Sequence, residues 1–193
     1  MSAGLAPEPG ALDALLCEPG LLLPVPKAAF WRITARYLLE PGERARPGIS
    51  PEWEALALPL PSHRLSGTPS RRGAVDLECE PAYLSSDELT ARAEFFARGQ
   101  ATRYKVWKVE LSLASCLDAA NPGVLERLDR SGIRLTQDHA TWVPLLRAAW
   151  SKEIEAIRFR SYVAEARGGL NYAILKLLPG ALVGAPQLIA AAG

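Results

Sequence analysis

Three residues of different chemistry stand in unusual surroundings: Arg32, Glu94 and Ser161. Arg32 lies in the apolar stretch 30–33, Glu94 lies inside an apolar helical segment, and Ser161 lies in an alternating segment beside Tyr162. A buried arginine needs an anionic partner, and a buried carboxylate needs a hydrogen-bond donor or it becomes protonated. A guanidinium group fits a diphosphate, and a carboxylate can bind a ribose hydroxyl or stabilise positive charge at C1 of a sugar. These residue types could therefore act together on a sugar diphosphate.

Each residue could also have a purely structural role. Glu94 and Arg98 are four residues apart, the favourable spacing for an exposed ion pair on a helix. Arg32 could project from the outer face of a half-exposed strand, and Ser161 could fill a small space. Glu88 stands at the capping-box spacing and fits a helix cap better than a catalyst. The residues by themselves leave a structural and a chemical role open.

Hydrophobic periodicity predicts the elements that would position these residues. The segment after Ser85 should form a helix that buries Leu89, Ala93, Phe96 and Ala97. The interval 40–80 is rich in proline and is predicted to be mostly loop. Strands without regular βαβ alternation favour an α+β fold. The predicted strands are 30–37, 82–84, 104–113, 157–163 and 170–175, and the predicted helices are 11–16, 85–98, 122–128 and 141–155.

The composition of the chain argues against several classes of function. The 193 residues include 22 Lys and Arg against 21 Asp and Glu, so the net charge of +1 argues against direct nucleic-acid binding. Three separated cysteines and two histidines make neither a disulfide framework nor a spaced zinc site, and we expect no metal. The sequence has no phosphate-binding glycine loop, dinucleotide fingerprint, HExxH or Gly-x-Ser-x-Gly motif. Without a signal-peptide pattern or an unbroken apolar span, the chain is expected in the cytoplasm, away from membranes.

Short motifs nevertheless follow one another in a consistent order. They are Phe30-Trp31-Arg32-Ile33, Leu65-Ser66-Gly67, Arg71-Arg72-Gly73, Ala82-Tyr83-Leu84-Ser85 and Leu89-Thr90-Ala91-Arg92-Ala93-Glu94, followed by Arg158-Phe159-Arg160-Ser161 and Gly169-Leu170-Asn171-Tyr172. The series resembles the RES-domain family, which is named for a characteristic arginine, glutamate and serine, and it covers about residues 29–176. The chain departs from the family where Ser70-Arg71-Arg72-Gly73-Ala74 replaces Gly-Gly-Arg-Trp-Asn and where Arg160 replaces a common proline. Either Arg71 or Arg72 could therefore match the family's loop arginine, and we take Arg72.

The resemblance implies a fold and a biological role. RES proteins are similar to ADP-ribosyltransferases, which implies an α+β domain with a split central β-sheet flanked by helices. The catalytic domain would span 29–176, with an N-terminal extension at 1–28 and an apolar tail at 177–193 packed on the domain or on a partner. Known members are commonly toxins that degrade NAD or transfer ADP-ribose and are blocked by a neighbouring antitoxin. A cognate antitoxin is therefore the expected partner, and the apolar termini also allow a homodimer.

The same resemblance assigns roles to residues. Arg32 would hold the diphosphate of NAD, Glu94 would steady the nicotinamide ribose as the glycosidic bond breaks, and Ser161 would hydrogen-bond the nicotinamide or its ribose. The implied activity is NAD glycohydrolase, with NAD as the substrate. The alternatives are ADP-ribosyl transfer to a specific target and a non-catalytic domain that binds a partner through 40–80.

Three further residues complete the expected substrate site. Arg72 would make a second contact to the dinucleotide, and Tyr83 would stack on or orient the nicotinamide ring. Asn171, in the closing motif, is the third substrate-binding residue.

Overall fold

A computed structural model describes residues 10–35, 81–97, 104–135 and 142–192. The helices are α1 (Ala11–Leu15), α3 (Glu88–Phe96), α4 (Pro122–Arg130) and α5 (Val143–Ser151), with a short 3₁₀ turn at Ala164–Ala166. The strands are β1 (Leu22–Ala35), β2 (Ala82–Ser85), β3 (Tyr104–Asp118), β4 (Ala156–Arg160), β5 (Leu170–Ile174) and β6 (Gln187–Ala192). The segment 40–80 and the loop with Arg71 and Arg72 lie outside these ranges.

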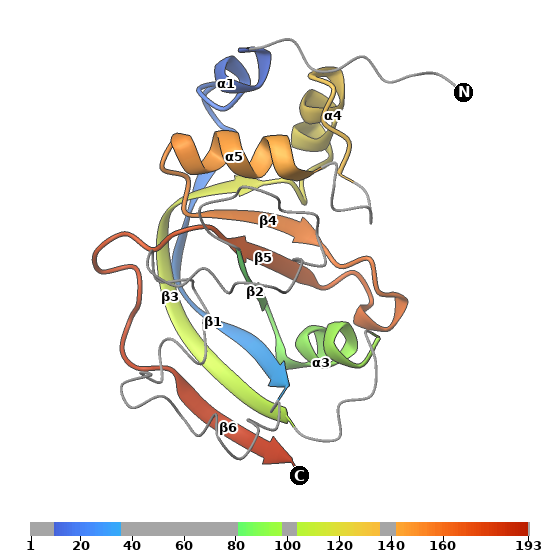
Figure 1. The fold of residues 1–193 in the computed structure, drawn as a ribbon, viewed down its shortest axis with the longest axis vertical. Helices are drawn as coiled ribbons and strands as arrows, with labels where there is room; N and C mark the ends of the chain where they lie inside the picture. Colours follow the sequence, from blue (N-terminus) through green and yellow to red (C-terminus); the bar gives the residue numbers. More distant parts are fainter. Residues whose placement is uncertain (1–9, 36–80, 98–103, 136–141, 193) are drawn as a thin grey trace, which may run out of the picture.

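The described strands form one sheet, in the order β1-β2-β5-β4-β3-β6, and β1 also pairs with β3. Five strands therefore close into a barrel-like ring, and β6 adds to β3 outside it (Figure 1). The α+β prediction is confirmed, but the predicted split of the sheet is wrong. The reason is the length of β1 and β3, with 14 and 15 residues. β3 pairs with β1 along most of its length and with β4 at its carboxyl end, which joins what would otherwise be separate halves.

The inside of this ring is an apolar core to which each of its five strands contributes. Phe30, Leu84, Val109, Ala156 and Tyr172 belong to one cluster of buried residues. The rings of Phe30 and Tyr172 meet edge to face, with centroids 4.8 Å apart. Because side chains alternate along a strand, the neighbours of these residues point outward.

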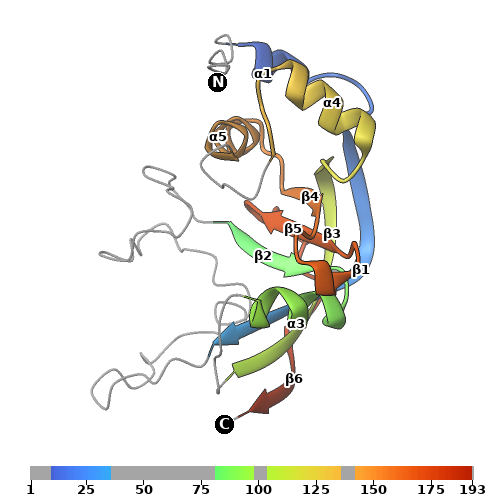
Figure 2. The same ribbon diagram turned by 90° about the vertical axis from the view of Figure 1, so that its right-hand side faces the viewer.

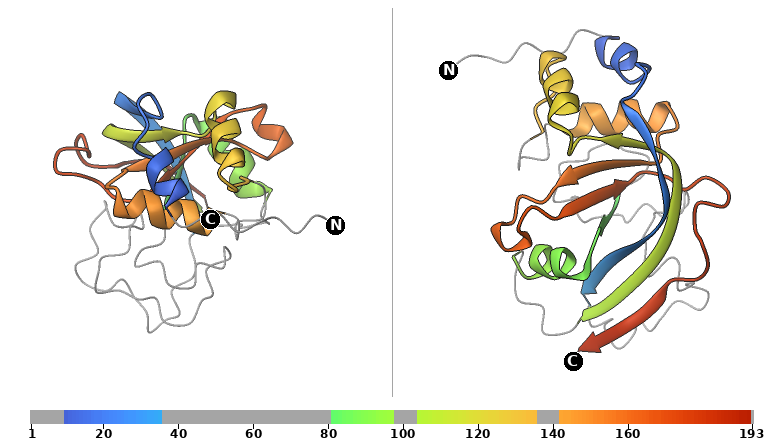
Figure 3. Two further views of the ribbon diagram at one scale, coloured as in Figure 1. Left: turned by 90° about the horizontal axis from the view of Figure 1, so that it is seen from above. Right: turned by 180° about the vertical axis from the view of Figure 1, so that it is seen from behind.

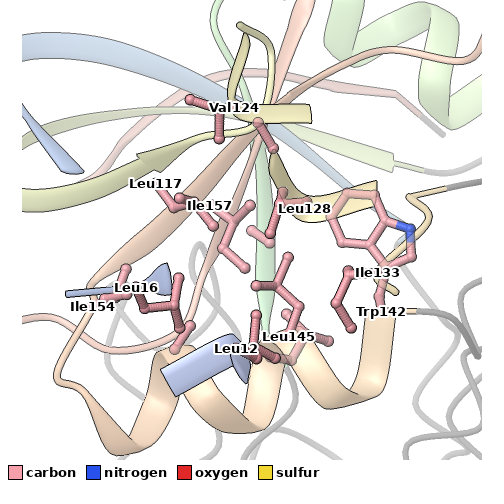
Figure 4. Packing of buried hydrophobic residues seen from close by; sticks show 14 of the residues in the cluster. Leu12, Leu16, Leu117, Val124, Leu128, Ile133, Trp142, Leu145, Ile154 and Ile157 are labelled. Carbon is pink, nitrogen blue, oxygen red and sulfur yellow. The ribbon is translucent and has the colours of Figure 1, made fainter. Parts of the chain in front are cut away.

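A second core lies on the outer face of the ring, at the end covered by α1, α4 and α5 (Figure 2). The apolar stripe of α5 and its N-cap residue pack into this core, where Trp142 and Leu145 are almost fully buried. Figure 4 shows the indole of Trp142 beside Ile133 and Leu128, and the ring of Phe159 meets the same indole edge to face. This layer of helices fixes β3, β4 and β5 from outside.

Helix α3 lies near the opposite end of the ring, beside β2 and the carboxyl end of β1 (Figure 2). Its N-cap is Asp87, whose side chain accepts from the Thr90 amide, so the predicted capping box starting at Ser85 is wrong. The predicted buried face is also wrong, because Leu89 and Phe96 are 61% and 45% exposed. The helix instead buries Thr90 and Ala91. The Thr90 hydroxyl donates to Asp87 Oδ2 at 2.8 Å, and this bond offsets the cost of burying it.

The two terminal segments both contribute to the sheet. β1 begins at Leu22 and crosses residue 28, where the sequence suggested a boundary. The tail supplies β6, which pairs antiparallel with β3 and, seen from behind, lies beside it (Figure 3). In the described part of the chain, no helix is long and apolar enough to cross a membrane.

Candidate functional site

A row of four residues crosses the outer face of the ring, from β1 beside α3 to Phe159 in the outer core. The strand registers place Trp31 on β1 opposite Ser85, Ser85 opposite Asn171 on β5, and Asn171 opposite Phe159 on β4. Directly opposed residues in antiparallel strands point to the same face. Ser85 and Asn171 are each only 5% exposed. Two buried polar side chains therefore lie between two aromatic ones.

Glu94 reaches this row from α3. Its Oε1 atom accepts hydrogen bonds from Ser161 Oγ and from Asn171 Nδ2, both at 2.6 Å. Ser161 follows the last residue of β4, and its hydroxyl oxygen also accepts from the Val163 amide at 3.1 Å. Hydrogen bonds to an ionised carboxylate are shorter and stronger than those between neutral groups. The carboxylate is thus held from two sides, by donors on different elements.

Asn171 connects Glu94 to β2. Its Oδ1 atom accepts from Ser85 Oγ at 2.8 Å, while its Nδ2 atom donates to Glu94. Turning the amide over would set a carbonyl oxygen against the carboxylate, so the orientation is fixed by charge. Ser85, Asn171, Glu94 and Ser161 form a continuous chain of side-chain hydrogen bonds, which we call the Glu94 network.

The position of α3 depends on a close approach at Gly169. A Cβ atom at Gly169 would lie 1.9 Å from Thr90 Oγ1, so only glycine allows this separation. Asp87 anchors the start of the same helix, because its Oδ1 atom accepts from the Thr90 amide at 2.7 Å. Burial acts to raise the pKa of Asp87, but hydrogen bonds from Thr90 and Ser86 outweigh it and lower the pKa. Glu94, one turn further along, is therefore fixed relative to the loop before β5.

Three of the site residues predicted from the sequence come together. Glu94, Ser161 and Asn171 are in direct contact in the Glu94 network. Arg32 does not share the outer face of the ring with these residues. It pairs with Trp107 on β3, and because side chains alternate along β1 it points to the inner face, as Phe30 does. The roles assigned to these residues toward NAD remain predictions.

Of the predicted substrate-binding residues Tyr83 and Arg72, the structure describes only Tyr83. Tyr83 shares the outward face of β2 with Ser85 and packs against the outer core, its ring edge-on to Phe159 with centroids 6.5 Å apart. Its contact with nicotinamide stays a prediction. Arg72 lies outside the described residues.

The sequence does not indicate Ser85 or Trp31 as site residues. The spacing of Ser85 to Glu88 predicts a helix cap, although β2 continues through Ser85 and the cap falls two residues later. Trp31 stands beside the charged Arg32, which carries the more obvious chemistry. Only the register of β1, β2 and β5 reveals both residues, and no periodicity within one segment encodes a register.

A second polar cluster lies on the inward side of the ring. Arg158 Nε donates to Asp118 Oδ1 at 2.8 Å, and Arg158 Nη2 donates to Oδ2. The guanidinium group lowers the pKa of Asp118, and the Asp118 carboxylate raises the pKa of Arg158. Burial raises the pKa of Tyr172, which also hydrogen-bonds Arg158. This cluster joins β3, β4 and β5, and its charges compensate one another.

In the described part of the chain, no group of three or more His, Cys, Asp or Glu side chains could hold a metal ion. The Glu94 network is the candidate functional site because it brings a carboxylate and two hydrogen-bond donors together from separate elements. It can present a fixed negative charge to a cationic or electron-deficient group.

Comparison with known proteins relates this fold to a solved structure. No protein-family model matches the sequence, and no curated protein sequence matches it. Among solved structures, the fold is that of a chain from a bacterial toxin–antitoxin assembly. One similar structure is the crystal structure of the M. tuberculosis MbcT–MbcA toxin–antitoxin complex, with a TM-score of 0.57 and 16% sequence identity. It covers 95% of this chain and 91% of that chain, so the shared fold extends over nearly the whole length of both.

Proposed function

We propose that this protein is a toxin of a toxin–antitoxin pair and that it degrades NAD by cleaving the bond between nicotinamide and ribose. The observation that carries the proposal is the Glu94 carboxylate, held at 2.6 Å by both Ser161 and Asn171. The fold shared with a chain of a toxin–antitoxin complex supports the toxin role. The resemblance of the sequence to RES domains supports the choice of NAD as substrate.

The chemistry follows from the charge at this site. When the C1′–N bond of the nicotinamide riboside breaks, the bonding electrons leave with nicotinamide and positive charge develops on the ribose. A preorganised carboxylate stabilises that charge without having to reorient. A water oxygen then bonds to C1′ and loses a proton to solvent, which gives ADP-ribose. Ser161 and Asn171 would keep the Glu94 carboxylate oriented throughout.

The remaining expectations become parts of the same proposal. Arg72 would bind the diphosphate, and Tyr83 would orient the nicotinamide ring. Arg32, on the opposite face of β1, would reach the diphosphate past the carboxyl end of this strand. A cognate antitoxin would block the enzyme in the cytoplasm. Transfer of ADP-ribose to a protein or small molecule would use the same Glu94 network, with another nucleophile in place of water.

The test is loss of NAD over time with purified protein, with the products separated by chromatography. Glu94→Gln keeps an oxygen that can accept from Ser161 and Asn171, so the fold should survive while NAD cleavage falls at least about 100-fold. The matched control is Glu88→Gln on the same helix, which removes only an ion pair with Arg92 and should retain activity.

The outcomes separate the candidate functions. NAD cleavage by the wild type and by Glu88→Gln, but not by Glu94→Gln, supports the glycohydrolase. Full activity of Glu94→Gln contradicts the assignment. If the wild type consumes NAD only when a cell extract is added, and labelled ADP-ribose moves to a component of that extract, the protein is a transferase. An inert wild type under both conditions would leave a non-catalytic binding domain.

A further inference from the structure

Ser85 has no role in the proposed chemistry so far, yet its contacts connect it to the carboxylate. Its hydroxyl is 2.8 Å from Asn171 Oδ1, and the amide nitrogen of the same Asn171 is 2.6 Å from Glu94 Oε1. We infer that Ser85 is a positioning residue for Glu94: it holds the Asn171 amide in the one orientation that donates to the carboxylate. This inference rests on the proposed function of Glu94 and adds a residue to its machinery.

The geometry makes Ser85 the donor in this pair. An amide oxygen only accepts, so the hydroxyl proton of Ser85 must point to Asn171 Oδ1. The opposite side of the amide is equally constrained, because a carboxylate only accepts and requires the NH₂ group. Each of the two bonds therefore has one allowed direction, from Ser85 to Asn171 and from Asn171 to Glu94.

Burial makes the Ser85 bond important. Ser85 and Asn171 are each 5% exposed, so water has little access to Asn171 Oδ1 if the hydroxyl is removed. A buried acceptor without its donor is costly, and the amide would turn about its terminal torsion to reduce that cost. Any such rotation moves Nδ2 away from Glu94. The backbone pairing of Ser85 with Asn171 would remain, since it does not involve either side chain.

Neither a cap nor a space-filling role accounts for the contacts of Ser85. It does not cap α3, because Asp87 holds that position. It is not simple filler, because alanine would fill nearly the same volume without the hydrogen bond. Its neighbour Ser86 faces a different partner, donating to Asp87 Oδ2 at 3.0 Å. Of these two serines, Ser85 is the one that contacts the Glu94 network.

The test compares Ser85→Ala with Ser85→Thr, which restores a hydroxyl, and with Ser112→Ala, a partly buried strand serine on β3 as the matched control. We expect Ser85→Ala to lower kcat for NAD cleavage about tenfold, the effect of one lost hydrogen bond, with KM for NAD little changed. Ser85→Thr should recover most of the loss, and Ser112→Ala should behave as wild type.

A second measurement does not depend on activity. The side-chain NH₂ signals of Asn171 in an ¹⁵N-labelled sample can be assigned by their loss in Asn171→Ala. In the wild type they should exchange slowly with solvent because Nδ2 donates to a carboxylate. In Ser85→Ala they should shift and exchange faster, and in Ser85→Thr they should return toward the wild-type positions.

The two measurements distinguish failure of this inference from failure of the proposed function. Wild-type kcat together with unchanged Asn171 signals in Ser85→Ala overturns the positioning role, even if Glu94→Gln is inactive. A wild type that does not cleave NAD refutes the proposed function, and the NMR signals alone then decide whether Ser85 orients Asn171. Changed signals with rescue by threonine support the inference in either case.

Discussion

Replacing Gly169 by alanine should push α3 away from the segment that carries Ser161 and Asn171. The added Cβ would lie 1.9 Å from Thr90 Oγ1 and 2.9 Å from both Thr90 Cβ and Cγ2. Rotation of the threonine would break its hydrogen bond to Asp87 and would still leave the 2.9 Å contact with Cβ, which does not move with χ1. Ordinary contacts begin near about 3.5 Å, so with this rotamer kept the helix and the loop must separate by roughly 1.5 Å.

This displacement should affect both stability and function. The φ angle of Gly169 is not in the left-handed region, so the cost is steric and comparable to overpacking a core, about 1–3 kcal/mol. With a urea m-value of about 2 kcal/mol/M, the unfolding midpoint should fall by about 1 M. Glu94 lies one turn beyond Thr90, and a shift of this size would break its 2.6 Å bonds to Ser161 and Asn171. NAD cleavage should then drop about 100-fold.

A double-mutant cycle with Thr90→Ala gives the control. Alanine at position 90 removes Oγ1 and Cγ2 and leaves only the 2.9 Å contact with Cβ. Gly169→Ala should therefore cost less free energy of unfolding in that background than in the wild type. An unchanged urea midpoint for Gly169→Ala, or an equal cost in both backgrounds, would refute the close approach.

Two further predictions concern groups away from the Glu94 network. Arg158 lowers the pKa of Asp118, so this carboxylate stabilises the fold above its ordinary pKa of 3.8, and that stabilisation is lost as pH falls through the folded value. Urea unfolding should therefore show Asp118→Asn less stable by about 1–3 kcal/mol at pH 7, with the difference shrinking as the pH falls below 3.8; a difference that does not change with pH would contradict the ion pair. Burial raises the pKa of Cys116 to about 12, whereas Cys17 is exposed. In a Cys79→Ala background, a thiol reagent at pH 8 should titrate Cys17 alone in the native protein and both thiols in denaturant, and native labelling of Cys116 would show that its burial is wrong.

Much of the fold can be predicted from local sequence. Alternating segments such as 104–113 form strands, and the stripe of α5 follows from its 3.6-residue spacing. The first half of β1 is not predicted, because Pro24 and Pro26 argue against a strand. They are accommodated where β1 pairs with β3 through register shifts. β6 is not predicted either, because its alanines favour strands only weakly, and it forms by pairing with β3.

The site can be predicted in part. Glu94, Ser161 and Asn171 follow from the resemblance, whereas residue chemistry alone also accounts for Glu94 as half of an exposed ion pair with Arg98. The prediction of which face of α3 is buried is wrong because apolar residues lie on both sides of this helix. The buried side is the one that contacts Gly169, a residue far along the chain. The orientation of Arg32 cannot be predicted from local sequence for a similar reason. Alternation along a strand implies that Trp31 and Arg32 face opposite ways, but it does not indicate which of them faces the site.

The sequence separations within the Glu94 network have a consequence for the newly made protein. Glu94 bonds to residues 67 and 77 positions later in the chain, and Ser85 bonds to one 86 positions later. Contacts between such distant segments form late and slowly, and a ribosome delivers the N-terminal segments first. A nascent chain that ends before residue 161 carries the carboxylate without either of its donors. The activity that we propose would therefore be absent during most of translation, so that the antitoxin we propose would have time to be present before the first active molecule exists.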